Sequence, residues 1–207
     1  MKYIVAVTII IGVALATNLN AQSSSLAFCV KPGMLVNGAH FGYKTDMLFA
    51  GVGLEFGSVS VNSKYRVTYG DTTYEDKSKT NASVFLPQIC ARVYLGNNTQ
   101  EEPGIRPYVW LSVFYSIATA KVTYNDQPEI EAEKEIKDLL GGNYGGSLAF
   151  GSEYYFSPHF SIGGEFGIRT LFGGTKSEYT GSSYTYTDEV NLGLGLTYTA
   201  FGLNFYF

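Results

Sequence analysis

The residues of this chain best placed to do chemistry are a few charged side chains within segments that otherwise alternate apolar and small residues. Brought together by folding, carboxylates and guanidinium groups can form a structural ion-pair network, a selectivity ring or a gated pore. We expect the structural network, because a buried charge persists when it is paired and hydrogen-bonded. Arg169 is expected beside Glu165 on its own strand and Glu153 on the next. The five residues of this predicted network are Glu55, Arg92, Glu153, Glu165 and Arg169.

Nucleophilic or acid–base catalysis has little support in the sequence. The chain has two histidines, His40 and His159, and both are predicted near short turns at the same end of the fold. A Ser–His–Asp constellation at the opposite end therefore cannot be assembled, and neither histidine has a local cluster of metal ligands. We expect no enzymatic activity, no catalytic residue, no metal site and no cofactor.

Two long connecting segments carry other candidate contacts. Segment 126–142 reads as a short helix, which begins with a capping-box pair, Asp126 and Glu129, and ends at Gly141-Gly142. Its residues 126–138 are strongly acidic. A solvated external helix is favoured there over a docking helix or a divalent-cation site. The other segment, 173–189, is rich in Tyr, Ser, Thr and Gly, a composition typical of adaptable contact surfaces and also of flexible loops. Its candidate contacts to an unknown extracellular ligand are Tyr179, Tyr184 and Tyr186.

The elements that position these residues are strands, because apolar residues recur at every second position. In the stretch 144–172, one face carries aliphatic and aromatic residues, and the other carries Gly, Ser, Glu and Arg. A lipid-facing exterior with a small polar interior would have this division. The chain predicts eight strands, at 25–31, 33–43, 47–61, 82–95, 105–123, 144–156, 160–172 and 190–207.

The lengths of the connections favour an up-and-down barrel over a sandwich. From the second strand onward, short connections at 44–46, 96–104 and 157–159 alternate with long ones at 62–81, 124–143 and 173–189. Transmembrane barrels have short periplasmic turns at one end and long external loops at the other. Two local irregularities are also expected: weak pairing or a bulge at Pro87, and a bulge near Thr199-Ala200, where the apolar residues change phase.

The end of the chain makes the comparison with a known family specific. Apolar residues alternate at Phe201, Leu203, Phe205 and the terminal Phe207, and this ending resembles that of outer-membrane β-barrel proteins. The turn and strand at 156–167 resemble those of small barrels of the OmpA/OmpX-like superfamily. The resemblance implies that Phe201, Leu203, Phe205 and Phe207 form a signal for the barrel-assembly machinery. It implies a fold and a location but no activity.

The start of the chain indicates export. Lys2, a short apolar core and Ala21 form the pattern of a cleaved signal peptide over residues 1–21, which leaves 22–207 as one barrel domain. The net charge of −4 argues against a nucleic-acid partner. No apolar run is long enough for a spanning helix.

The sequence therefore predicts an all-β, antiparallel, up-and-down transmembrane β-barrel of eight strands, with a short helix in one external loop. Its predicted place is the outer membrane of a Gram-negative cell, as a monomer in contact with outer-membrane lipid and lipopolysaccharide. The predicted role is structural, or interaction through the external loops. Two alternatives stay open: an exported soluble lipocalin-like barrel that binds an apolar ligand, and a small solute or ion pore.

Overall fold

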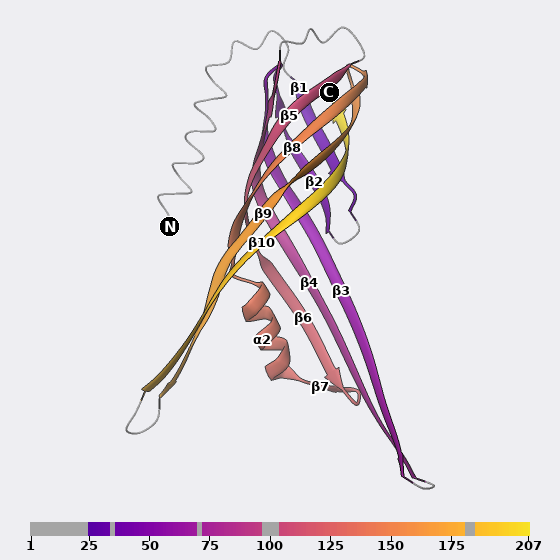
Figure 1. Cartoon of the computed structure of the whole chain (residues 1–207), viewed down its shortest axis with the longest axis vertical. Coiled ribbons are helices and arrows are strands. Elements are labelled where there is room, and N and C mark those ends of the chain that lie inside the picture. The colour runs from indigo at the N-terminus through magenta and orange to yellow at the C-terminus, as the bar shows by residue number, and fades with distance from the viewer. Residues whose placement is uncertain (1–24, 34–35, 70–71, 97–103, 181–184) are drawn as a thin grey trace.

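The computed structural model describes residues 25–33, 36–69, 72–96, 104–180 and 185–207, with the backbone alone at 69, 175–180 and 185–192. Antiparallel strands make up most of this part of the chain, with one helix beside them (Figure 1). The predicted signal peptide, 1–21, lies outside the described residues. The elements are β1 (Ser25–Lys31), β2 (Val36–Lys44), β3 (Leu48–Tyr69), β4 (Thr72–Tyr94), β5 (Ile105–Tyr115), β6 (Ile117–Tyr124), β7 (Gln127–Pro128), α2 (Ile130–Leu140), β8 (Tyr144–Ser157), β9 (Phe160–Thr180) and β10 (Thr185–Tyr206).

Within the described residues, eight strands close into a ring in the order β1-β2-β3-β4-β5-β8-β9-β10. The ring closes where β10 pairs with β1, with Phe205 opposite Phe28. All of the pairings are antiparallel, and each ring strand lies beside the next one along the chain. The prediction of an all-β fold with eight antiparallel strands in sequence order is confirmed, including the short first strand.

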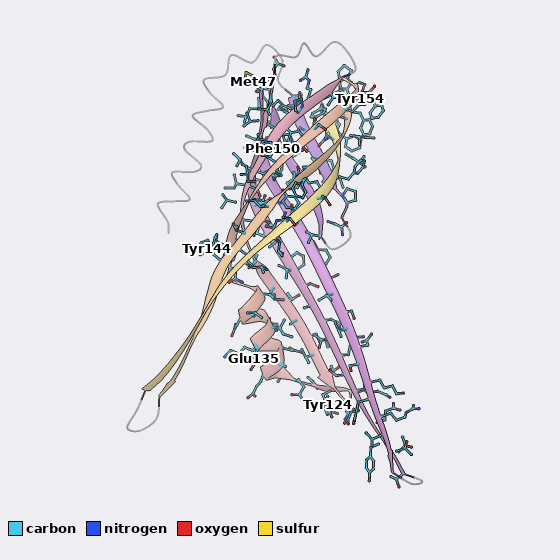
Figure 2. All side chains as sticks on the ribbon, viewed as in Figure 1. Met47, Tyr124, Glu135, Tyr144, Phe150 and Tyr154 are labelled. Carbon is cyan, nitrogen blue, oxygen red and sulfur yellow. The ribbon has the colours of Figure 1, made fainter. Side chains whose placement is uncertain are left out.

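The two faces of the ring have opposite character, as the alternation predicts. On β8, the side chain of Phe150 is 66% exposed on the outside, whereas Glu153 on the inside is 0% exposed. Figure 2 shows Phe150 and Tyr154 standing out from the wall of the ring. Successive strand residues point to opposite faces, so the outer wall is apolar and the inner face holds polar and charged groups.

Two of the predicted long loops are not loops, and this is the main correction to the predicted fold. β3 and β4 stay paired as far as Tyr69 opposite Thr72, well past Gly57, where β2 stops pairing with β3. β9 and β10 stay paired as far as Thr180 opposite Thr185. We call residues 58–69 and 72–83 the first arm, and residues 173–180 and 185–192 the second arm; the two leave the ring in different directions (Figure 1). The first arm's sequence is polar but rich in β-branched and aromatic residues, which favour strands, and its polarity was mistaken for loop character.

β10 contains no bulge, contrary to the prediction near Thr199-Ala200. Its register with β9 is unbroken from Phe205 to Thr185. The change of phase has another cause. Leu194 and Leu196 lie on the inward face of β10 together with Tyr198, but they lie outside the part of β10 that pairs with β1, which ends at Leu203. They are 43% and 54% exposed there, because β10 is paired at these residues with β9 on one side and with no strand on the β1 side.

The ladder is interrupted at Pro87, as predicted, but without a bulge. β4 pairs with β5 up to Gln88 opposite Phe114 and resumes with β6 at Phe85 opposite Ile117, in an unchanged register. Pro87 has no N–H to donate. Across the ladder, Ser116 instead exchanges backbone hydrogen bonds with the segment that precedes β8: its N–H donates to Asn143 and its carbonyl accepts from Gly142.

Helix α2 lies in the predicted loop but starts later than predicted. Its N-cap is Glu129, without a side-chain capping bond, and Asp126 sits in the preceding turn with φ of 64°. The predicted capping box is therefore wrong, whereas the predicted glycine end is right: Gly141 is the C-cap, and Gly142 has φ of 75°. A carboxylate oxygen of Glu133 accepts the N–H of Val122, which ties α2 to β6. None of the described helices is long and apolar enough to cross a membrane.

Ring closure can be tested by crosslinking its two ends. With Cys29 and Cys90 replaced by Ala, a Phe28→Cys/Phe205→Cys pair should form a disulfide on mild oxidation, because directly opposed residues lie about 5 Å apart. The pair Phe28→Cys/Leu203→Cys is the control, because that diagonal is roughly 7–8 Å long. Gel migration of the denatured chain reports the crosslink. Equal crosslinking of both pairs would contradict the register, and none in either would contradict closure.

Candidate functional site

The candidate site is a network of charged and aromatic side chains that fills the inside of the ring. All five predicted residues project inward, and four of them are buried. Arg169, near the end from which the arms extend, keeps 19% of its side chain exposed. We call this set, together with its hydrogen-bond partners, the interior network. It is built around three carboxylates.

The first carboxylate, Glu153 on β8, forms an ion pair with Arg92 on β4. The hydroxyls of Tyr155 and Tyr206 donate to it at 2.6 and 2.8 Å, and those of Tyr94 and Ser161 at 3.3 Å. Both oxygens are therefore saturated with donors, which is the condition under which a carboxylate can be fully buried.

The second carboxylate, Glu165 on β9, is paired with Lys31 on β1 at 2.6 Å. The hydroxyls of Tyr108 and Tyr198 donate to it at 3.1 and 3.2 Å. The Lys31 ammonium also lies 3.4 Å from the centre of the Trp110 ring, a cation–π contact in a desolvated setting. This carboxylate thus joins four strands of the ring.

The third carboxylate, Glu55 on β3, is paired with Arg169 on β9 at 2.8 Å. His40 on β2 lies 3.9 Å from its other oxygen and contacts the side-chain nitrogen of Gln88 at 2.9 Å. The His40 ring also packs edge-on against Trp110. His40 lies in the middle of β2 inside the ring, so its predicted place near a turn is wrong. His159 does lie at a turn, where Nδ1 contacts the carbonyl of Tyr206 at 2.9 Å.

The predicted partner of Arg169 is wrong. The register places Arg169 opposite Ser147, six residues from Glu153, a separation of roughly 20 Å along the strands. Arg169 instead reaches across the interior to Glu55 on β3. Proximity on neighbouring strands does not decide the partner of Arg169, because ring closure brings distant strands face to face.

Several residues of the interior network were missed from the sequence. The cations Lys31, Lys44 and Arg106 are all buried, and Lys44 lies within 6 Å of the ring centres of Tyr94, Tyr155 and Tyr206. The alternation could have found them, since Lys31 falls two residues after Cys29 on the inward face of β1. The tyrosines were overlooked because aromatic residues also suit the outer wall.

The two cysteines, Cys29 and Cys90, are buried and unpaired. The thiol of Cys90 contacts the carbonyl of Gly51 at 3.5 Å.

The arms carry the other predicted contacts. Tyr179 on β9 lies directly opposite Tyr186 on β10 in the second arm, where only the backbone is described, and Tyr184 lies outside the described residues.

Among the described residues, no group of three or more His, Cys, Asp or Glu side chains could hold a metal ion. The ion pairs of the interior network join the ring strands to one another.

Comparison with known proteins gives no match to a protein-family model and no match to a curated protein sequence. The resemblance to small outer-membrane barrels therefore depends on the C-terminal pattern and the turn at 157–159.

The pairing of Arg169 with Glu55 gives a test with a built-in control. Arg169→Met should lower the free energy of unfolding by about 3 kcal/mol, because Glu55 is left as a buried, uncompensated charge. Adding Glu55→Gln should restore part of the loss, since the orphaned charge is then gone. Adding Glu165→Gln instead should lower stability further, because it removes the partner of Lys31. The temperature at which folded chain converts to unfolded chain on a gel measures each effect. If Glu55→Gln and Glu165→Gln restored the stability of the Arg169→Met chain equally, the pairing of Arg169 with Glu55 would be contradicted.

Proposed function

We propose that this chain is an integral β-barrel protein of the bacterial outer membrane, without enzymatic activity, that crosses the bilayer with its eight-strand ring and holds its two arms and helix α2 on the outside. Its role is structural or interactive, through the arms, and it acts as a monomer. Outer-membrane lipid, lipopolysaccharide and the barrel-assembly machinery are the proposed partners.

The observation that carries this proposal is the continuous apolar outer wall. Large apolar side chains are exposed on all eight ring strands. A soluble protein rarely exposes so large a contiguous apolar surface, whereas lipid is its natural solvent. Examples, one from each strand in ring order, are Leu26, Phe41, Val52, Ile89, Leu111, Phe150, Phe166 and Phe205.

The height of the apolar wall also suits a bilayer. On β8 the outward run extends from Tyr144 to Phe156, roughly 40 Å along the strand, or ~28 Å along the ring axis at a tilt of about 45°. That is close to the ~25 Å apolar band of outer-membrane barrels. Aromatic pairs occur at both ends of the band, with Tyr144 against Phe172 at one end and Tyr154 against Phe156 at the other, as in the girdles at membrane interfaces.

The interior network argues against the two alternatives. A lipocalin-like carrier needs an apolar cavity and a polar exterior, and this ring has the opposite arrangement. A pore needs an open interior, whereas ion pairs cross this one from β4 to β8 and from β3 to β9. An eight-strand ring is just wide enough for its own side chains.

Fractionation tests the proposal directly. The exported chain should be found in the outer-membrane fraction, need detergent for solubility and migrate differently on a gel before and after heating. In planar bilayers its conductance should stay near background. Recovery as a monodisperse protein in plain buffer would overturn the membrane assignment in favour of a soluble carrier, and clear single-channel conductance would favour the pore.

The C-terminal pattern gives a second test. The N–H of Phe207 donates to the carbonyl of Leu26 at the seam between β10 and β1, and its side chain is exposed. Deletion of Phe207 should reduce the amount of folded chain in the outer membrane, whereas Phe207→Tyr, which keeps the ring, should not. Unchanged levels after the deletion would show that this ending is not recognised during assembly.

A further inference from the structure

The outward face of the first arm is basic. Beyond the apolar wall, three strands lie side by side: β3 and β4 of the arm, and β6 next to β4. The register places Lys121 opposite Asn81, Lys79 opposite Asn62, Lys77 opposite Lys64, and Glu75 opposite Arg66. Because directly opposed residues share a face, this face carries five cations and one carboxylate, in a chain whose net charge is −4. We call it the basic face; its charged members are Lys64, Arg66, Lys77, Lys79, Lys121 and Glu75.

The single carboxylate neutralises only part of this charge. Glu75 is paired with Lys64 at 2.8 Å, Arg66 at 3.0 Å and Lys77 at 3.2 Å. Hydrogen bonds from Lys64 and Arg66 lower the pKa of Glu75 from 4.5 to about 2. Stability from this cluster is thus present above pH 4.5 and is lost as the pH falls through about 2. In the described part of the chain, no carboxylate lies within ion-pair distance of Lys79 or Lys121.

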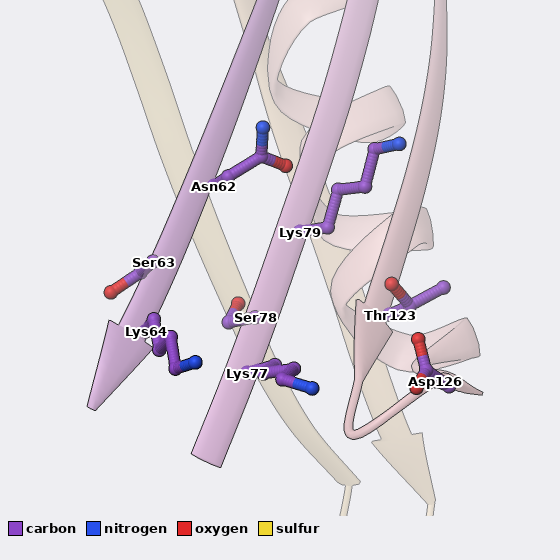
Figure 3. Close-up of a pocket in the computed structure, with 8 residues that line it drawn as sticks. All are labelled: Asn62, Ser63, Lys64, Lys77, Ser78, Lys79, Thr123 and Asp126. Atoms are coloured by element: carbon purple, nitrogen blue, oxygen red, sulfur yellow. The ribbon is translucent and has the colours of Figure 1, made fainter. Parts of the chain in front are cut away.

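A hollow on the arm gathers several of these cations with neutral donors (Figure 3). Ammonium groups with amide and hydroxyl donors are the set that binds phosphate oxygens. One carboxylate, Asp126, also borders the hollow, which has a volume of about 280 Å³. Its lining includes Lys64, Lys77, Lys79, Asn62, Thr123 and Asp126.

The other face of these strands has a different character. On β6, Ala120 and Val122 are buried, whereas Lys121 between them is exposed. Helix α2 packs against β6, and segment 126–138, which includes most of α2, has six acidic residues and two lysines. The positive charge is therefore confined to the side of the arm that continues the apolar wall.

The distance of the basic face from the apolar wall indicates which layer of the membrane it contacts. Lys121 lies four residues beyond Ile117 of the wall, roughly 13 Å along the strand and ~9 Å along the ring axis at a tilt of about 45°. Lys77 lies eight residues beyond Phe85, or ~19 Å along the axis. Tilted strands that continue straight from a ring flare outward like a hyperboloid, and the first arm leans away from the ring (Figure 1). Its outer face is thereby turned toward the plane of the membrane.

We propose that the basic face binds the phosphate groups of a phosphorylated glycolipid in the leaflet around the arm end of the ring. This inference rests on the proposed membrane location. The cations extend over more than the roughly 5–8 Å depth of an ordinary headgroup layer, so lipids whose phosphates are carried on sugars fit better than simple phospholipids. Cations spread along a sheet also suit an array of phosphates better than one free ion.

A titration of the folded full-length mature chain in detergent tests this site. The probe is purified lipopolysaccharide, and the readout is the rise in the temperature at which folded chain converts to unfolded chain on a gel. Lys79→Gln/Lys121→Gln removes the two unpaired cations and leaves the Glu75 cluster intact. Lys134→Gln/Lys137→Gln on α2 is the matched control, because it removes the same charge away from the basic face.

The unaltered chain and the α2 control should be stabilised equally. At low ionic strength, Lys79→Gln/Lys121→Gln should need about 30-fold more lipid for the same rise, since each lysine near an anionic surface contributes about 1 kcal/mol. Glu75→Gln should act in the opposite direction and need less lipid, because it releases three cations. This second variant keeps the test decisive if the double lysine variant does not fold.

Four results would overturn the proposal. Equal lipid requirements of the basic-face and control variants would remove the site, and no decrease for Glu75→Gln would contradict the charge argument. Equal stabilisation by phosphatase-treated lipid would indicate contacts with sugar or acyl chains. Equal stabilisation by pyrophosphate in lipid-free micelles would indicate a free-anion site. Each can occur while the chain still fractionates with the outer membrane, so failure here is distinguishable from failure of the proposed function.

Discussion

The structure depends on the neutralisation of buried charge inside a narrow ring. Three carboxylates each meet a cation from another strand: Glu153 with Arg92, Glu165 with Lys31, and Glu55 with Arg169. Such charges are tolerated in a low-dielectric interior only while they stay paired and hydrogen-bonded. The pairs join strands that are not neighbours in the ring, so they cross the narrow interior that eight strands leave. With the polar groups directed inward, the outer wall can be apolar throughout.

The same ring sets the direction of everything beyond it. β3, β4, β9 and β10 continue past the end of the ring without a change of register, so each arm inherits the tilt of its strands. Inward positions that are buried within the ring become exposed where β10 approaches the second arm, as at Leu194 and Leu196. The outward face of the first arm changes from apolar to basic in the same direction, which is the order in which a protein leaving a bilayer meets hydrocarbon and then phosphate.

The local parts of the fold were predictable from the sequence because they follow from period-two alternation. The ring strands and the inward direction of Glu55, Arg92, Glu153, Glu165 and Arg169 all come from this rule. The arms were not predictable by the same reasoning, because a two-stranded ribbon in water has no buried face and gives no apolar alternation to detect. Helix α2 was recognised from its composition and its glycine end, but its start was misplaced because a turn at Asn125-Asp126 and the short strand β7 come before it.

The sequence by itself determined which residues form the ring strands and which side of each ring strand is polar, since both properties depend on nearest neighbours along the chain. Only the tertiary structure decided which charges meet. Arg169 pairs with Glu55 because closure of β10 onto β1 curves the sheet until β9 faces β3. It also decided that Lys64, Lys77, Lys79 and Lys121 form one surface, because the registers of β3 with β4 and of β4 with β6 bring three separate segments into line. Strand register and ring curvature are set by contacts between residues far apart in the chain, and no local pattern encodes them.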